Sequence, residues 1–245
     1  MFSGNPVLGE KLFLDRSEAR ETNAMTVQGT ATRALLLLIL VVGSAAVSWR
    51  MASAQPELSG ILVGGGLIGG LVLAMITIFK QEWARVTSPI YALLEGVALG
   101  AISMLFEKAY PGIVGSAVGL TFGVLLLMLV IYKLRIIRVT PMFARGVMAA
   151  TGAVALVYMV SFVLRIFGTS VPYIHESGTL GILFSVAVVV IAALNLALDF
   201  HMIETGQEQG LPKYMEWYAA FALMVTLVWL YIEILRLLAK ARGRR

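Results

Sequence analysis

Seven long apolar segments, separated by short polar connections, constrain this chain more than any other feature. They cover approximately residues 32–49, 58–79, 88–106, 112–132, 143–167, 179–202 and 216–239. A helix rises about 1.5 Å per residue, so segments of roughly 20 residues can cross a hydrocarbon core about 30 Å thick. Backbone N–H and C=O groups find no water in lipid, so each segment must be a helix. The sequence therefore predicts an all-α, polytopic membrane protein with seven transmembrane helices.

The composition supports this fold class and sets the domain boundaries. The chain is 59% hydrophobic and 13% charged, whereas soluble domains carry about 25% charged residues. We expect a polar N-terminal tail at residues 1–30, a transmembrane domain at 31–240 and a basic C-terminal tail at 241–245. The connections are too short to hold a soluble domain. The tail lacks the apolar core of a signal peptide, so we expect no cleaved leader.

Several function classes are excluded by what the sequence contains. The net charge of +5 does not indicate nucleic-acid binding, because the basic residues lie in short loops where they meet anionic lipid. The absence of cysteine excludes disulfides and thiolate chemistry. There is no metalloprotease or P-loop motif, and neither Ser161 nor Ser185 lies in a Gly-x-Ser-x-Gly turn. We therefore expect no enzyme, no cofactor, and the lipid bilayer as the principal partner.

Basic residues predict the orientation of the chain. One side would carry eleven of them and the other only Arg50 and Lys108. The eleven are Lys11, Arg16, Arg20, Arg33, Lys80, Arg85, Lys133, Arg135, Arg138, Arg145 and Lys213. The positive-inside rule then places the N-terminus in the cytoplasm. The basic C-terminal tail conflicts with an outer location. Either the last segment crosses despite its tail or it re-enters, and its length favours seven crossings.

Glycines spaced by four predict close helix packing. They occur in the second segment at Gly60/Gly64, Gly65/Gly69 and Gly66/Gly70, in the third at Gly96/Gly100, and in the fourth at Gly115/Gly119/Gly123. Such stripes let a neighbouring backbone approach closely. We expect packing within one tight bundle rather than an oligomer interface.

One acidic residue interrupts the sixth segment. No charge occurs from Thr179 to Leu198, and Asp199 then appears while the chain is still apolar. A charged side chain in the membrane is costly and is functional by default when it faces protein or water. The alternative is that Asp199 sits in the headgroups at a helix end and has no role. His201 follows it, and we expect a solvated residue there.

Depth suggests which other acids lie near Asp199. With the N-terminus inside, Glu95 lies about 10 Å above the inner end of the third segment. Glu216 begins the seventh segment on the same side. Glu95, Asp199 and Glu216 are therefore expected in the cytoplasmic half of the bundle. Glu233, about 25 Å beyond Glu216, belongs near the outer side, where Arg236 is at ion-pair spacing.

Clustered carboxyl groups suggest a cation site that responds to pH. Neighbouring carboxylates cannot all ionise in a low-dielectric site, so one would hold a proton and release it when a cation binds. Oxygen ligands suit Ca²⁺. Lys80, Arg85 or Arg145 could pair with an acid and hold a closed state. The structural alternatives are a helix–helix hydrogen bond for Glu95 and an interfacial anchor for Glu216.

Three segments carry a resemblance to a known family. They are SPIYALLEGVALGAIS at 88–103, AALNLALDFHMIETG at 192–206 and PKYMEWYAAFALMVTLVWLYIEILRLL at 212–238. The tail segments NPVL (5–8) and MTVQGT (25–30) look like those of longer bacterial members. The chain resembles the bacterial branch of the transmembrane Bax-inhibitor-motif family over nearly its whole length. The resemblance implies six helices around a central seventh, and a pH-dependent Ca²⁺ leak across the cytoplasmic membrane.

The resemblance also implies a site of two aspartates, one in each of the last two helices. Asp199 matches the first, whereas the second position falls on Thr226. The second acid is thus either absent or supplied by Glu216 or Glu95. The family's latching arginine has its nearest counterparts in Lys80 and Arg85.

We therefore expect a pH-sensitive Ca²⁺ leak with Asp199 as its proton and ion sensor. The alternative is a membrane regulator without transport activity, since some bacterial relatives are thought to modulate a membrane-bound AAA protease. Residues 1–24 would then form the contact.

Overall fold

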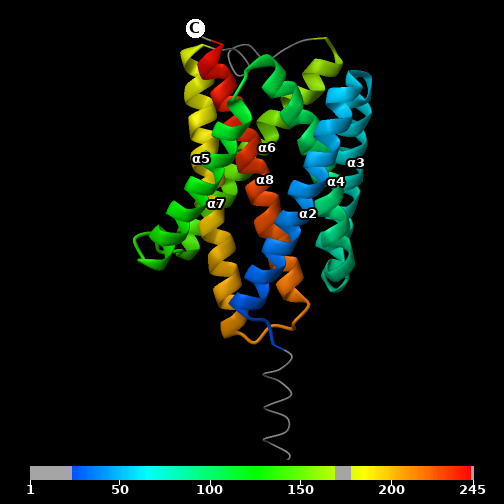
Figure 1. Ribbon diagram of the computed structural model, residues 1–245. Coiled ribbons are helices and arrows are strands. Elements are labelled where there is room, and N and C mark those ends of the chain that lie inside the picture. The colour runs from blue at the N-terminus through cyan, green and yellow to red at the C-terminus, as the bar shows by residue number, and fades with distance from the viewer. Residues whose placement is uncertain (1–23, 169–177, 244–245) are drawn as a thin grey trace, which may run out of the picture.

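The computed structural model describes residues 24–168 and 178–243, and within these ranges the chain is helical. Its long helices, labelled as in Figure 1, are α2 (Val27–Ala54), α3 (Ser59–Phe79), α4 (Ala84–Ala109), α5 (Ile113–Lys133), α6 (Pro141–Ile166), α7 (Thr179–Glu208) and α8 (Met215–Arg242). Each is long and apolar enough to cross a membrane. The seven predicted spans are confirmed as helices.

Several helices extend past the predicted spans, among them α2 and α7. α2 begins at Val27, inside the range assigned to the tail, because the Thr26 side chain caps it by accepting a hydrogen bond from the Gly29 N–H at 2.9 Å. Residues 1–23 of the tail, including residues 5–8, lie outside the described residues. α7 continues to Glu208, so Asp199 lies about two and a half turns before the helix end.

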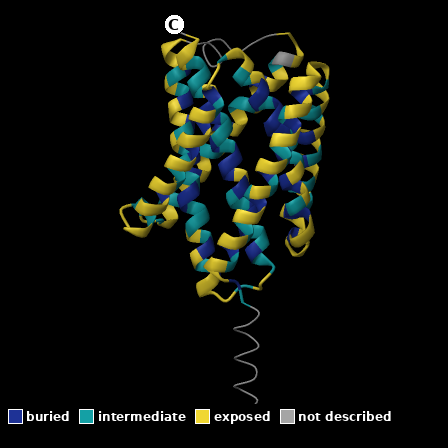
Figure 2. Cartoon of the chain, in the orientation of Figure 1, coloured by how far each residue is buried: buried dark blue, intermediate teal, exposed yellow. Residues whose placement is uncertain are grey.

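The last helix lies inside the bundle. α8 packs against α7, α2, α5 and α4, whereas α3 packs mainly on α4 and α6 on α7. Figure 1 shows α8 running between α7 and α2, with the start of α2 and the C-terminus at opposite ends. Exposed residues cover the outer faces of the helices in Figure 2, and many are large apolar side chains, as lipid contact requires. This arrangement is consistent with the expected central seventh helix.

The glycine stripe of α4 and the later part of the stripe in α3 pack as predicted, whereas an added Cβ at Gly60, Gly64 or Gly65 would meet no atom within 4 Å. A Cβ added at Gly66 would lie 2.7 Å from the Leu94 carbonyl oxygen of α4, and one at Gly100 would lie 2.1 Å from the Ala45 carbonyl oxygen of α2. α4 thus touches α3 on one face and α2 on another, backbone to backbone. The stripe in α5 is different, because an added Cβ at Gly115, Gly119 or Gly123 would meet no atom within 4 Å. The expectation of intramolecular packing is wrong for that stripe.

We expect Gly100→Ala to destabilise the protein and Gly119→Ala to leave its stability unchanged or slightly higher. The first substitution forces α2 and α4 apart, and overpacking costs about 1–3 kcal/mol. The second adds a methyl group in open space and improves helix propensity. Thermal unfolding in detergent measures both. A Gly100→Ala protein as stable as wild type would contradict the close α2–α4 contact.

Candidate functional site

The Asp199 carboxyl group lies between the last two helices. It is within hydrogen-bonding reach of the Thr226 hydroxyl of α8. Its Oδ2 atom is buried and has no hydrogen-bonding partner among the described residues. Asp199 therefore faces the bundle rather than lipid or bulk water, as a sensor requires. The position that the resemblance assigned to the second acid does lie opposite Asp199, although it holds a threonine.

Thr226 can accommodate Asp199 in either protonation state. A hydroxyl group has one proton to donate and two lone pairs that accept. The Thr226 hydroxyl also reaches the Ala222 carbonyl oxygen of its own helix, at 3.3 Å. It can therefore donate a hydrogen bond to an ionised Asp199, or accept a hydrogen bond from a neutral Asp199 while donating to the Ala222 carbonyl oxygen. The contact does not select one charge state in the way that an arginine would.

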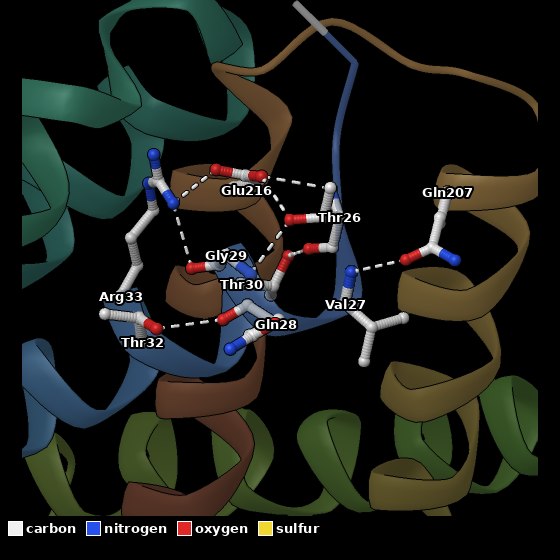
Figure 3. A network of polar contacts seen from close by, with 9 residues as sticks. All are labelled: Thr26, Val27, Gln28, Gly29, Thr30, Thr32, Arg33, Gln207 and Glu216. Atoms are coloured by element: carbon white, nitrogen blue, oxygen red, sulfur yellow. Dashed lines mark hydrogen bonds and ion pairs between the residues drawn. The ribbon is translucent and has the colours of Figure 1, made fainter. Parts of the chain in front are cut away.

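Glu216 is held in a network that joins the start of α2 to the start of α8 (Figure 3). The Thr26 backbone N–H and hydroxyl both donate to Glu216 Oε1, at 3.0 and 2.9 Å. Glu216 Oε2 forms an ion pair with Arg33, which also donates to the Gly29 carbonyl oxygen at 2.9 Å. Only 1% of the Glu216 side chain is exposed. Glu216 is thus a buried carboxylate, with Oε1 hydrogen-bonded to Thr26 and Oε2 paired with Arg33.

This network requires a glycine at residue 29. A Cβ there would lie 2.2 Å from Glu216 Oε1. Nearby contacts strengthen the same junction: the Val27 N–H donates to the Gln207 side chain of α7 at 2.7 Å, and the Met25 N–H donates to the Leu211 carbonyl oxygen at 2.7 Å. The Arg33 guanidinium also lies over the Trp217 ring, 5.4 Å from its centroid. The first turn of α2 is therefore fastened to both α7 and α8.

Glu95 occupies a third environment. It is buried in α4, and its Oε2 lies so close to α3 that a Cβ added at Gly70 would be 2.8 Å from it. No described residue hydrogen-bonds to it, and neither Glu95 nor Glu216 interacts with Asp199. The structure thus places the three candidate acids in separate surroundings rather than in one cluster. The described residues contain no group of three or more acids or histidines able to hold a metal ion.

The predicted latch residues do not meet an acid. Lys80 lies over the Trp83 ring, 4.6 Å from its centroid, and Arg85 and Arg145 are exposed. Within residues 24–168 and 178–243, the ion pairs are Arg33–Glu216 and Arg236–Glu233. Arg33 is therefore the basic partner that sequence reasoning missed. Its signal was an arginine near the start of an apolar helix, where a charge requires a partner.

A second polar cluster lies toward the opposite end of α8. Glu233 pairs with Arg236 at 3.0 Å, as its spacing predicted, and it also accepts a hydrogen bond from the Tyr158 hydroxyl of α6 at 2.8 Å. One turn further on, the Lys240 ammonium donates to the Ser185 hydroxyl of α7 at 2.8 Å. This cluster ties α8 to α6 and α7. His201 is exposed, as expected.

The comparisons with known proteins confirm the resemblance. The profile of the family described as Bax inhibitor 1 like matches residues 5–243. The chain belongs to this family. No curated protein matches the sequence significantly. Family membership shows that this is a multi-pass membrane protein of the Bax inhibitor 1 like type. It does not identify an ion, a trigger or a partner.

We expect Arg33 and Glu216 to be strongly coupled in stability. Removing one partner of a buried pair leaves the other uncompensated and costs about 3–5 kcal/mol. Arg33→Gln and Glu216→Gln should each lower the unfolding temperature, and the double variant should lose much less than the sum. A double-mutant cycle in detergent measures this coupling.

The matched control is the pair of exposed residues Glu82 and Arg85. Glu82→Gln and Arg85→Gln should each lower the unfolding temperature little, and their effects should add in the double variant. Additive losses at Arg33 and Glu216 would contradict a structural ion pair there.

Proposed function

We propose that this protein is a pH-sensitive cation leak, with Ca²⁺ as the transported ion and Asp199 as the group that exchanges a proton for a cation. The observation that carries the proposal is the buried Asp199 Oδ2, which lacks a partner among the described residues. A carboxylate that accepts hydrogen bonds from structural donors is stabilised in its ionised form and therefore resists a change of protonation state. Among the described residues, the group opposite Asp199 is a hydroxyl, which serves both protonation states.

The proposed mechanism is competition for one carboxyl group. Ionised Asp199 offers hard oxygen ligands to Ca²⁺, and protonation removes that ligand. Water and the Thr226 hydroxyl complete the transient coordination, which suits an ion that passes rather than one that resides. Cation flux should therefore fall as the pH is lowered.

Two interactions at opposite ends of α8 are proposed to hold the closed state. Arg33 fixes the start of α8 to α2 through Glu216, and Tyr158 fixes its later turns to α6 through Glu233. Arg33 takes the latching role for which the resemblance offered Lys80 or Arg85. Glu95, which is buried in α4 and receives no hydrogen bond from a described residue, is the second acid that could assist a passing cation.

We also propose the bacterial cytoplasmic membrane as the location, with the N-terminus in the cytoplasm. The support is the eleven-to-two distribution of basic residues between the two sides. The network around Glu216 would then face the cytoplasmic half and the cluster around Glu233 the outer half.

We expect Asp199→Asn to abolish the pH dependence of Ca²⁺ flux. Protein reconstituted in liposomes with an internal Ca²⁺ dye should show greater influx at pH 8 than at pH 6, with pH 7 between. Asparagine cannot ionise, so flux through the variant should be low or equal at the three values. The control, Glu208→Gln, removes an exposed acid from the same helix and should behave as wild type.

Retention of the wild-type pH profile by Asp199→Asn would overturn the sensor role. No flux from folded wild-type protein at any pH would overturn the leak itself and favour the non-transporting regulator. Deletion of residues 1–24 would then be expected to abolish binding of a membrane-bound AAA protease.

A further inference from the structure

An apolar groove opens between α2 and α5 at the end of the bundle where α2 begins. α2 packs on α4 and α8, and α5 packs on α7 and α8, which leaves a space of about 960 Å³ between them. This volume is at the upper end of the roughly 300–1,000 Å³ typical of ligand sites. Its walls are mostly aliphatic and include Leu35, Leu38, Leu125, Leu129, Leu223 and Leu227.

The mouth of this groove is basic. Lys133, Arg135 and Arg138 line it where α5 ends, and all three are exposed. The one acid in the lining is Glu204, whose carboxylate already accepts a hydrogen bond from Tyr132. Three cations therefore face one engaged carboxylate at the end of an apolar groove. This combination matches a molecule with an anionic head and an apolar body.

The backbone at Arg135 points to a use for its side chain. Arg135 has φ of 56°, and it is the non-glycine residue with positive φ among those described. It ends α5 in a Schellman-type turn, with the Ile136 N–H donating to the Ile131 carbonyl oxygen at 3.1 Å. Glycine is the usual residue at such a position. An arginine in this strained conformation indicates that the side chain has a function.

The groove also continues along the bundle. A second apolar space of about 450 Å³ shares Leu38 and Leu227 with the first and extends past Val41 and Val228. The two spaces together follow the direction of the helices. An acyl chain can therefore lie along α2 and α8 while its head stays at the basic mouth.

We propose that this groove binds one anionic phospholipid. The phosphate would lie among Lys133, Arg135 and Arg138, and the acyl chains would follow α2, α5 and α8. Charge complementarity favours an anionic lipid over a zwitterionic one, whose own cation offsets the phosphate. The site also lies on the side that the distribution of basic residues assigns to the cytoplasm, where anionic lipids attract basic segments.

Native mass spectrometry of the full chain in detergent tests this proposal with phosphatidylglycerol and phosphatidylcholine as probes. Wild type should retain one phosphatidylglycerol, with a preference over phosphatidylcholine on the order of tenfold or more for three cations. The variant K133Q/R135Q/R138Q should lose that preference. The control K80Q/R85Q/R145Q removes three charges from the same side outside the groove lining and should keep it.

Two further variants distinguish a loss of lipid binding from misfolding and from non-specific attraction between lipid and the basic surface. Arg135→Gly suits the positive φ, so it should keep or raise the unfolding temperature while weakening phosphatidylglycerol binding. Ala31→Trp narrows the groove without changing charge and should also weaken binding. Equal retention of the two lipids by wild type, equal loss in the control triple, or unchanged binding by Ala31→Trp would each overturn the proposal.

Discussion

The cost of placing a carboxyl group inside a membrane shapes this structure more than any other interaction. Lipid offers no hydrogen bonds, so an acid in a membrane helix must face protein and meet a partner there. Glu216 and Glu233 satisfy this demand through Arg33 and Arg236. Glu216 also accepts two hydrogen bonds from Thr26, the N-cap of α2, and Glu233 accepts one from Tyr158 of α6. Both acids lie on α8, and their partners join α8 to α2 and α6. The burial of these acids and the packing of α8 inside the bundle therefore depend on each other.

Asp199 and Glu95 depart from this pattern, and we propose the function for Asp199 because it lies opposite Thr226 of α8. Its neighbour is a hydroxyl, and one of its oxygens lacks a partner among the described residues. A fully engaged acid stabilises one conformation, whereas a partly engaged acid can exchange a proton for a cation. The two networks on α8 would then hold the helix in place, while the contact between Asp199 and Thr226 responds to pH and ions. The basic groove beside α5 would add a response to lipid composition, separate from the site at Asp199.

The sequence predicted the spans well and the partners poorly, for physical reasons. Each membrane helix needs a long run of apolar residues to contact lipid, and this run is visible in the sequence, so all seven helices were predicted. A glycine stripe shows that close packing is possible but not which neighbour provides it, so α4 was predicted correctly and α5 was not. Arg33 was missed because it pairs with Glu216 across the whole length of the chain. The position of Thr226 opposite Asp199 came from the family resemblance, since no periodicity within one helix reveals a neighbour on another.

The central claim is that Asp199 changes its protonation state within the folded bundle. Infrared difference spectroscopy of the reconstituted protein between pH 8 and pH 6 tests it most directly. We predict a carboxylic acid C=O band at pH 6 that is absent from Asp199→Asn and shifted in Thr226→Val, where the hydroxyl contact is lost. A band that persists unchanged in Asp199→Asn would place the titrating group elsewhere and contradict the account.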